Sequence, residues 1–294
     1  MQASFQIGTH QLAARPLDPA LYLVATPIGN LADITLRALE TLASADVLAC
    51  EDTRVTRVLL SRYAIATRPH AYHEHNAEQA GPKLIAALKE GRSVALMSDA
   101  GTPLVSDPGF RLVELALAAN IRVIPIPGAS APLAALVASG LPSDSFFFGG
   151  FLPSRDKARR DRLTQLRGTP ATLLFFESPR RLKDCLRACA EVLGPERPAA
   201  VCRELTKLYE EVRRGSLGEL AAHYADQDTV KGEIVLAIGP PEPQVVSIDD
   251  AEAMLRELAQ SMPTAKAATQ AAKQTGLPRR DLYQRLLAIK DETP

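Results

Sequence analysis

Short apolar runs alternate with segments of helical apolar spacing through the first 130 residues of the chain. Runs such as Val47–Cys50 and Val94–Met97 are typical of buried parallel strands. Residues 77–89 and 110–119 instead repeat apolar positions at the spacing of a helix. This alternation, from Leu21 to Pro127, predicts a doubly wound α/β domain with a parallel sheet.

The pattern changes after Ser130, and it predicts a second α/β domain. Helices are predicted at 155–167 and 179–193, and strands at 146–148, 172–176, 199–202, 209–212 and 234–238. The short spacing from Cys202 to Tyr209 predicts a hairpin, which makes the second sheet mixed.

Composition suggests where these parts begin and end. Gly239–Pro243 is rich in Gly and Pro and is typical of a linker. We therefore expect a flexible arm over 1–17, α/β domains over 18–128 and 129–242, and a helical domain over 243–294. In the last part, Asp249-Asp250 and Thr264 are predicted to cap helices, and a third helix is predicted to end near Ile289. This arrangement resembles a helix-turn-helix, although a small packing appendage fits the same pattern.

Three loops rich in Gly and Pro follow predicted parallel strands. They are Thr26–Leu31, Ser98–Gly109 and Pro127–Ala131. Each loop alone fits a tight strand-to-helix turn. Because ligands of open α/β sheets bind at the carboxyl ends of the strands, the three together predict a shared crevice. None matches the dinucleotide or phosphate-loop fingerprint, which disfavours a bound pyrophosphate.

Composition and charge narrow the class of protein. The 294 residues have a formal net charge of zero, which argues against a protein that coats nucleic acid. A signal peptide and a long apolar run are both absent from the sequence, so a cytoplasmic protein with no membrane partner is expected. The spacing of the four cysteines predicts free buried thiols, and His70, His73 and His75 lack a further ligand, so no metal is expected.

One segment has an excess of basic residues. Between Ser154 and Gly168, six basic residues stand against two acidic ones, a pattern that fits either a solvated helix face or a phosphate contact. The candidates for RNA binding are Arg155, Lys157, Arg159, Arg160 and Arg162.

The ordered motifs of the chain resemble a known family. They are Val24–Leu31, Glu51–Arg54, Ser98–Pro103, Pro127-Gly128, Gly150–Pro153, Glu177-Ser178, Arg203–Lys207 and Lys231–Glu233. Together they cover about residues 20 to 290 and resemble the ribosomal RNA branch of the tetrapyrrole methylase superfamily, the class III S-adenosylmethionine methyltransferases. The resemblance implies a homodimer that binds S-adenosylmethionine in a cleft between its two α/β domains. It also implies 2′-O-methylation of a cytidine in the decoding region of 16S rRNA in the small ribosomal subunit.

The resemblance also implies which residues bind the cofactor. They are Pro27, Asp99, Ala100, Gly101, Thr102, Val105, Ser130, Ala131, Phe176 and Ala200. The chain departs from its relatives in the third loop, where Ala129 stands at a position that is often proline and Ser130 at one that is cysteine in some of them.

Methyl transfer to a ribose requires a group that takes the hydroxyl proton. The candidates are Glu177, Lys207 and Glu233, with Glu204 and Lys231 as further possibilities, and Glu177 is the first choice because it ends a strand beside the expected cofactor. Each of them could instead belong to a structural ion pair. Glu51–Arg54 is expected to cap a helix, with Arg54 at the cleft wall or on RNA.

Without the resemblance, three other classes fit the residues: a small-molecule transferase such as a tetrapyrrole methyltransferase, a nucleotide-binding oxidoreductase, and an RNA-binding protein without catalysis. The missing dinucleotide fingerprint counts against the second class, and the zero net charge counts against the third.

Overall fold

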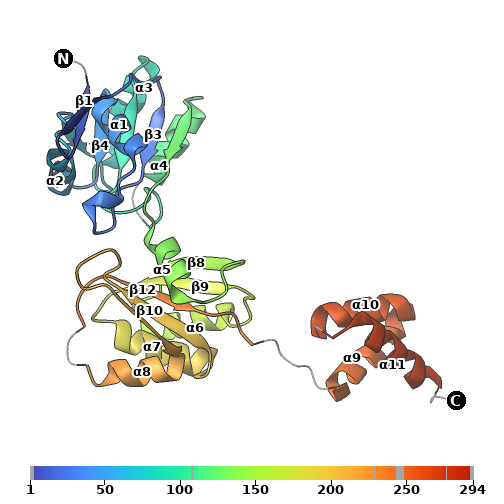
Figure 1. The fold of residues 1–294 in the computed structure, drawn as a ribbon. Coiled ribbons are helices and arrows are strands. Elements are labelled where there is room, and N and C mark those ends of the chain that lie inside the picture. Colours follow the sequence, from blue (N-terminus) through green and yellow to red (C-terminus); the bar gives the residue numbers. More distant parts are fainter. Residues whose placement is uncertain (1–2, 107–108, 228–229, 243–247, 276, 292–294) are drawn as a thin grey trace. The chain divides into compact units, whose positions relative to one another are not determined.

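The computed structural model describes residues 3–106, 109–227, 230–242, 248–275 and 277–291. Residues 1–240 form one compact unit and residues 241–294 form another. The division falls inside the predicted linker. Within the first unit, the chain builds two five-stranded sheets one after the other (Figure 1).

The first sheet has five parallel strands in the order β5-β4-β6-β3-β7, as the doubly wound prediction requires. The strands are β3 (Leu21–Val24), β4 (Val47–Cys50), β5 (Pro69–Ala71), β6 (Val94–Met97) and β7 (Val123–Ile126). Strand β5, which includes His70, was not predicted. It is an edge strand of three residues that begins with Pro, so it leaves no apolar run in the sequence.

Helices cover both faces of this sheet because successive strand side chains point to opposite faces. Tyr22 and Val24 share a core with α1 (Leu36–Ser44) and α2 (Thr53–Arg62). Leu21 instead shares a core with α3 (Ala77–Lys89) and α4 (Phe110–Ala118). A short 3-10 helix, η1 (Leu31–Asp33), follows the first loop, and the Ala32 N–H donates to the Asn30 side chain that caps it.

The second sheet is mixed, as the predicted hairpin implies. Its order is β11-β10-β12-β9-β8, and only β8 and β9 run parallel. The strands are β8 (Phe146–Phe151), β9 (Thr172–Glu177), β10 (Pro198–Arg203), β11 (Glu211–Ser216) and β12 (Ile234–Ile238). One face packs on α6 (Asp156–Leu166), α7 (Leu182–Leu193) and α8 (Leu217–Ala225), and the other on α5 (Ala131–Ser139).

The prediction of a flexible arm over 1–17 is wrong for most of that segment. Strands β1 (Ser4–Ile7) and β2 (His10–Ala13) form an antiparallel hairpin, and Phe5 is buried in the core of the first sheet. The Gln6 N–H donates to the Tyr63 carbonyl at 2.8 Å. All four β2 residues are exposed, so the alternation that marks a half-buried strand is missing from the sequence.

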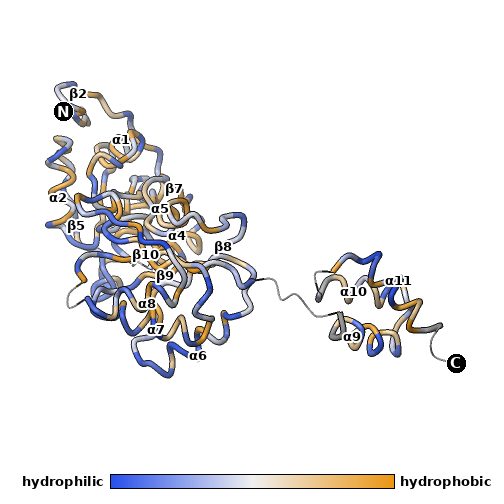
Figure 2. The backbone as a smooth tube through the Cα atoms, turned by 60° about the horizontal axis from the view of Figure 1, so that its bottom comes forward, coloured by the Kyte–Doolittle hydropathy of each residue, from blue (hydrophilic) through white to orange (hydrophobic). Residues whose placement is uncertain are grey.

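The second unit contains α9 (Ile248–Ser261), α10 (Thr264–Thr275) and α11 (Arg279–Asp291). Leu255, Ala267, Ala271, Leu282 and Leu286 form a core of its own, and Figure 2 shows hydrophobic and hydrophilic residues alternating along these helices. Helix α9 begins before Asp249, so the two predicted capping aspartates lie in its first turn instead. Among the described helices of the whole chain, none is long and apolar enough to cross a membrane.

Candidate active site

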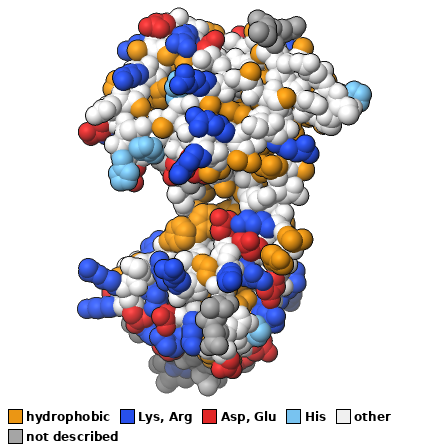
Figure 3. Space-filling model, turned by 90° about the vertical axis from the view of Figure 1, so that its left-hand side faces the viewer, with side chains coloured by type: hydrophobic (Ala, Val, Ile, Leu, Met, Phe, Trp, Pro, Cys, Tyr) orange, Lys and Arg blue, Asp and Glu red, His pale blue; other side chains and the backbone are white. Residues whose placement is uncertain are grey.

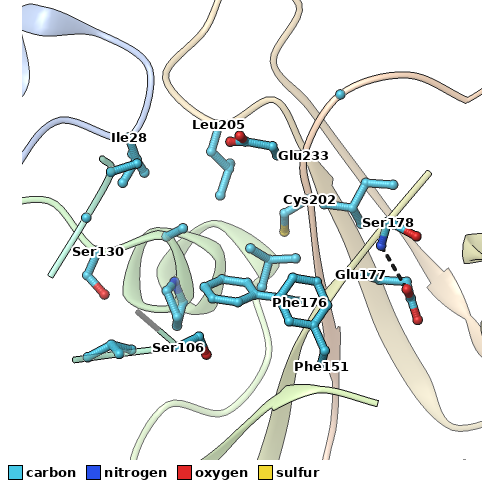
Figure 4. A pocket seen from close by; sticks show the side chains of 18 of the residues that line it. Ile28, Ser106, Ser130, Phe151, Phe176, Glu177, Ser178, Cys202, Leu205 and Glu233 are labelled. Carbon is cyan, nitrogen blue, oxygen red and sulfur yellow. Dashed lines mark hydrogen bonds between the residues drawn. The ribbon is translucent and has the colours of Figure 1, made fainter. Parts of the chain in front are cut away.

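The three predicted loops contribute to one cavity of about 380 Å³ within the first unit (Figure 4). Small-molecule sites in proteins span about 300–1,000 Å³. The first sheet contributes Ile28 after β3 and Ala100–Thr102, Val105 and Ser106 after β6, and Ser130–Pro132 come from the start of α5. The second sheet supplies the opposite wall: Phe151, Phe176–Pro179, Cys202, Leu205 and Gly232–Val235.

Hydrogen bonds join the three loops to one another. Thr26 and Gly101 exchange backbone bonds at 2.8 and 3.0 Å, and the Thr102 hydroxyl donates to the Ala129 carbonyl at 3.4 Å. Gly101 has a φ of 76°, which glycine adopts without strain. The loops therefore form one connected wall of the cavity.

Most of the residues expected to bind the cofactor lie on this cavity. Its lining includes Ala100, Gly101, Thr102, Val105, Ser130, Ala131 and Phe176. Three others do not lie on it. Pro27 is buried beside the lining residue Ile28, Ala200 is fully buried, and the Asp99 carboxylate accepts the Asp52 N–H at 2.9 Å.

Strand alternation explains which residues the sequence analysis missed. Ala200 and Cys202 belong to the same face of β10, but Cys202 is the one that reaches the cavity. Phe151 also lies on the cavity, where its ring centroid is 5.5 Å from that of Phe176. Because side chains two residues apart share a face of a strand, counting two residues on from Ala200 would have found Cys202. Leu205, Ser106 and Val235 also line the cavity and carry no comparable signal.

The Cys202 thiol is buried and neutral. Burial raises its pKa to about 11, and its Sγ donates to the Ala135 carbonyl of α5 at 3.8 Å. The four cysteines are all free and buried in the structure, as predicted.

The Glu177 carboxylate does not face the cavity, although the residue is part of its lining. Its side chain is 0% exposed. Oε1 accepts the Ser178 N–H at 2.8 Å and lies 3.3 Å from the Arg181 Nε. In Figure 4 the carboxylate lies beside the Ser178 nitrogen, turned away from Phe176. Because Phe176 faces the cavity, the next residue of the strand faces the core with Phe175 and Cys185. This geometry fits the ion-pair alternative better than the role of general base.

Lys207 lies between two carboxylates at the edge of the cavity. Its Nζ donates to Glu204 Oε1 at 2.8 Å and to Glu233 Oε2 at 3.0 Å. Burial disfavours the ammonium, but the hydrogen bonds to the two glutamates outweigh it and raise the pKa of Lys207. The hydrogen bond from Lys207, with a second from the Glu233 N–H, lowers the pKa of Glu204. Lys207 is therefore a permanent cation at neutral pH and cannot take a proton.

The backbone around this cluster is shaped to hold it. Gly232 has a φ of 93°, and a Cβ there would lie 2.3 Å from Glu204 Cγ, so only glycine leaves room for Glu204. Glu204 and Thr206 both have positive φ, at 51° and 67°. The Thr206 hydroxyl accepts the Asn30 N–H of the first loop at 3.2 Å, which links the loop after β10 to the loop after β3.

The described cavity lining offers no cationic side chain to an anionic ligand. Among the described residues that line it, none is Lys, Arg or His, whereas Glu233 is acidic and its side chain is 78% exposed. Apolar side chains dominate the remainder of the lining.

The predicted RNA-binding residues of α6 are divided by the fold. Arg159 is buried, at 4% side-chain exposure, and pairs with Asp156, so its assignment to RNA is wrong: it lies on the face of α6 that packs on the sheet. Arg160 pairs with Asp156 and Glu191. Arg155 and Lys157 are exposed, and the Arg162 guanidinium lies 5.7 Å from the centroid of the Phe147 ring.

Asp52 caps α2, as the sequence predicts for the Glu51–Arg54 segment. Its Oδ1 accepts the Arg54 N–H at 2.7 Å, and the Arg54 side chain, 86% exposed, pairs with the same carboxylate. The hydrogen bonds from the Arg54 side chain and backbone lower the pKa of Asp52 to about 2.

The histidine segment forms no metal centre in the described part of the chain. The rings of His73 and His75 are 6.0 Å apart at their centroids. Across the described residues, no group of three His, Cys, Asp or Glu side chains is placed to hold an ion.

Two family models match the chain. The model of the tetrapyrrole (corrin/porphyrin) methylases matches residues 20–221, and the model of the RsmI C-terminal HTH domain matches residues 246–290. The first match includes all of the lining residues of the cavity except Gly232–Val235.

Curated relatives are similar over nearly the full length. A ribosomal RNA small subunit methyltransferase I from Mesorhizobium japonicum is 64% identical over 97% of each chain. The protein of the same name from Halalkalibacterium halodurans is 50% identical over 90% of this chain and 93% of its own.

Solved structures share the fold at lower identity. A cobalt precorrin-4 methyltransferase aligns with a TM-score of 0.58 at 19% identity, over 74% of this chain and 94% of its own. A uroporphyrin-III C-methyltransferase from Thermus thermophilus, complexed with S-adenosyl homocysteine, aligns with a TM-score of 0.51 at 21% identity, over 75% and 97%.

Proposed function

Because the chain belongs to the tetrapyrrole methylase family, and within it to the ribosomal RNA small subunit methyltransferases I, we propose that it methylates the ribose 2′ oxygen of a cytidine in the decoding region of 16S rRNA. The methyl donor is S-adenosylmethionine. The observation that carries the proposal is the cavity lined by all three loops, within a chain that is 64% identical to a ribosomal RNA small subunit methyltransferase I.

The residues of the cavity fit the proposed cofactor. When bound, S-adenosylmethionine supplies an electrophilic methyl group on a sulfonium cation. The Ala100–Thr102 backbone, with Ser130 and Ala131, would hold its polar groups, and Phe151 and Phe176 offer apolar surface. The described lining holds no basic side chain, which disfavours a pyrophosphate.

Glu233 is the best-placed group to take the ribose proton. Its carboxylate is exposed on the cavity, and Lys207 binds only Oε2, which leaves Oε1 for the substrate. Lys207, being cationic, orients this carboxylate and does not accept the proton. Glu177, the first choice from the sequence, is already occupied by Ser178 and Arg181. We therefore assign the general base to Glu233 and the positioning role to Lys207.

The proposal extends to partners and place of action. The substrate is the small ribosomal subunit or its 16S rRNA, which would place the protein in the cytoplasm. Arg155 and Lys157 are exposed and available to phosphates, whereas the exposed Arg54 is paired with Asp52. A homodimer and the predicted bounds of the two α/β domains and the helical domain also remain part of the proposal.

Two measurements test the function. Calorimetry on the full chain should detect S-adenosylmethionine binding, and the protein should transfer radiolabelled methyl groups to small subunits from cells that lack it. Mapping methylated riboses in that 16S rRNA then identifies the nucleotide. Transfer to a uroporphyrinogen but not to subunits would favour a tetrapyrrole substrate instead. Folded protein without detectable cofactor binding at millimolar concentration would exclude both.

A further inference from the structure

Helix α2 exposes a face of arginine and valine residues. Over Thr53–Arg62 the helix contains three arginines and no acidic residue. Thr56, Leu59 and Leu60 are buried against the first sheet, so the other side of the helix faces solvent. We call the set Arg54, Val55, Arg57, Val58, Ser61 and Arg62 the α2 face; all six residues are exposed.

Two arginines of the α2 face are free to bind an anion. The Arg54 guanidinium pairs with Asp52, whereas no carboxylate among the described residues lies within ion-pair distance of Arg57 or Arg62. Arg62 lies 5.8 Å from the centroid of the Tyr63 ring, a contact that leaves its hydrogen-bond donors available. Unpaired guanidinium groups on a surface match phosphate in charge and in donor geometry.

The valines of the same face are not explained by helix stability. Val55 and Val58 are 46% and 60% exposed, and β-branched residues have low helix propensity. An exposed helix position that serves only the fold would favour Ala, Glu or Lys. Apolar side chains between arginines are suited to the sugars and base edges that lie between phosphates.

The α2 face begins beside the candidate active site. The Asp52 N–H at the start of α2 donates to Asp99 Oδ1, and the next residue after Asp99 lines the cavity. A helix of ten residues extends about 15 Å from that point. Figure 3 looks onto the side of the molecule that carries α2 in Figure 1, and it shows Lys and Arg side chains following one another down the upper half toward the lower half.

We propose that the α2 face binds the phosphate backbone of the RNA whose ribose enters the cavity. The inference rests on the proposed function and deepens it by naming the surface that holds the substrate. Within α6, by contrast, Arg159 is buried and Arg160 is paired, whereas α2 carries two unpaired arginines on a helix that begins beside the cavity.

The test removes the two free charges and keeps the helix. The variant R57Q/R62Q uses Gln because its helix propensity is high, and it leaves the Asp52 cap and its ion pair with Arg54 intact. Binding of small ribosomal subunits is measured against salt concentration by filter retention. The slope of log K against log salt should become less steep by about 0.7–0.9 for each phosphate that the protein no longer neutralises, hence by about 1.4–1.8 for the two arginines. The affinity for S-adenosylmethionine should stay as in the wild type.

The matched control is K83Q/K89Q, which removes two exposed cations from α3 on the other face of the same sheet. It should leave the salt slope unchanged. The inference is overturned if R57Q/R62Q has the same salt slope as the wild type. If that slope is unchanged and the sedimentation mass of the variant differs from that of the wild type, the α2 face contacts a second copy of the chain instead. Wild-type protein that methylates no rRNA overturns the proposed function itself, and is recognised before any variant is made.

Discussion

Glu177 Oε1 lies 3.3 Å from the Arg181 Nε, and this carboxylate is turned away from the cavity that its neighbour Phe176 lines. The glutamate side chain is wholly buried and the arginine is 29% exposed, so the pair belongs to the structure of the second sheet. The same sheet presents a different carboxylate, that of Glu233, to the cavity.

The first prediction concerns this ion pair. E177Q should lower the free energy of unfolding by about 1–3 kcal/mol, because Arg181 loses a charged partner. The single-turnover methylation rate should stay within a few-fold of the wild type. Urea unfolding and a rapid-quench assay measure the two quantities. A rate reduced 100-fold in a variant of unchanged stability would restore Glu177 as the general base.

The second prediction concerns Glu233. E233Q should reduce the single-turnover rate by about 10²-fold or more, because the amide cannot take the ribose proton. Cofactor affinity and the unfolding midpoint should remain unchanged, since most of this side chain is in solvent. E219Q is the matched control: that glutamate belongs to the capping box of α8, away from the cavity. Equal rates for E233Q and the wild type would contradict the assignment.

The third prediction concerns acid stability. The hydrogen bond from Lys207 lowers the pKa of Glu204 below its ordinary value of 4.5. A depressed folded pKa contributes stability above the unfolded value, and this contribution is lost as the pH falls from 4.5 through the folded pKa. Unfolding free energies measured between pH 6 and pH 3 should therefore fall less steeply for E204Q than for the wild type. Parallel curves would mean that the Glu204 carboxyl has the same pKa in both states.

The fourth prediction separates the basic residues of α6. R159A should cost about 1–3 kcal/mol of stability, because it removes a buried hydrogen-bonded side chain, and should leave the salt slope of subunit binding unchanged. R155Q/K157Q should leave stability unchanged and, if these exposed cations meet phosphate, reduce the slope. Denaturant unfolding and salt titration of the two variants measure the difference. An R159A protein with native stability and a reduced slope would reverse the assignment.

The fifth prediction concerns the thiols. A pKa of about 11 leaves only about one Cys202 in a thousand as thiolate at pH 8, and all four cysteines are buried. Ellman's reagent should therefore find no fast-reacting thiol in the folded protein and four in guanidinium chloride. A fast-reacting thiol that S-adenosylmethionine protects would mean that the cavity opens widely in solution.

The sequence predicted the two sheets because their buried strands are continuous apolar runs. Val47–Cys50 and Val94–Met97 lie where they were expected, and α3 spans the predicted residues 77–89. The hairpin at Phe5 was missed because its second strand is wholly exposed. Its first strand is held by a contact with a distant residue, the bond from the Gln6 N–H to the Tyr63 carbonyl, which a local pattern does not contain.

The sequence predicted which loops line the candidate site, but it did not predict which way the charged side chains point. Ala100–Thr102 and Ser130 line the cavity because Gly and Pro loops mark the carboxyl ends of the strands. Glu177 was expected to contact the substrate ribose and Arg159 to contact RNA, but both side chains are buried in the core. In β9 nearly every residue is buried on one face or the other, so polarity alone does not tell which face a charged residue takes.

The hydrogen bond from Asn30 to Thr206 makes one backbone amide a reporter of cleft opening. Asn30 follows the first strand of the first sheet, and Thr206 belongs to the hairpin of the second. The Asn30 N–H donates to the Thr206 hydroxyl on the opposite wall of the cavity. Deuterium exchange of this N–H should therefore be slow only while the two walls are close enough to form the bond. Thr206 and Glu204 have positive φ angles, which cost conformational free energy in residues with a side chain. Once the bond to Asn30 is broken, this strain favours a change in the backbone of the loop between β10 and β11. The exchange rate at this single position therefore measures how often the cavity is open for a nucleotide to enter.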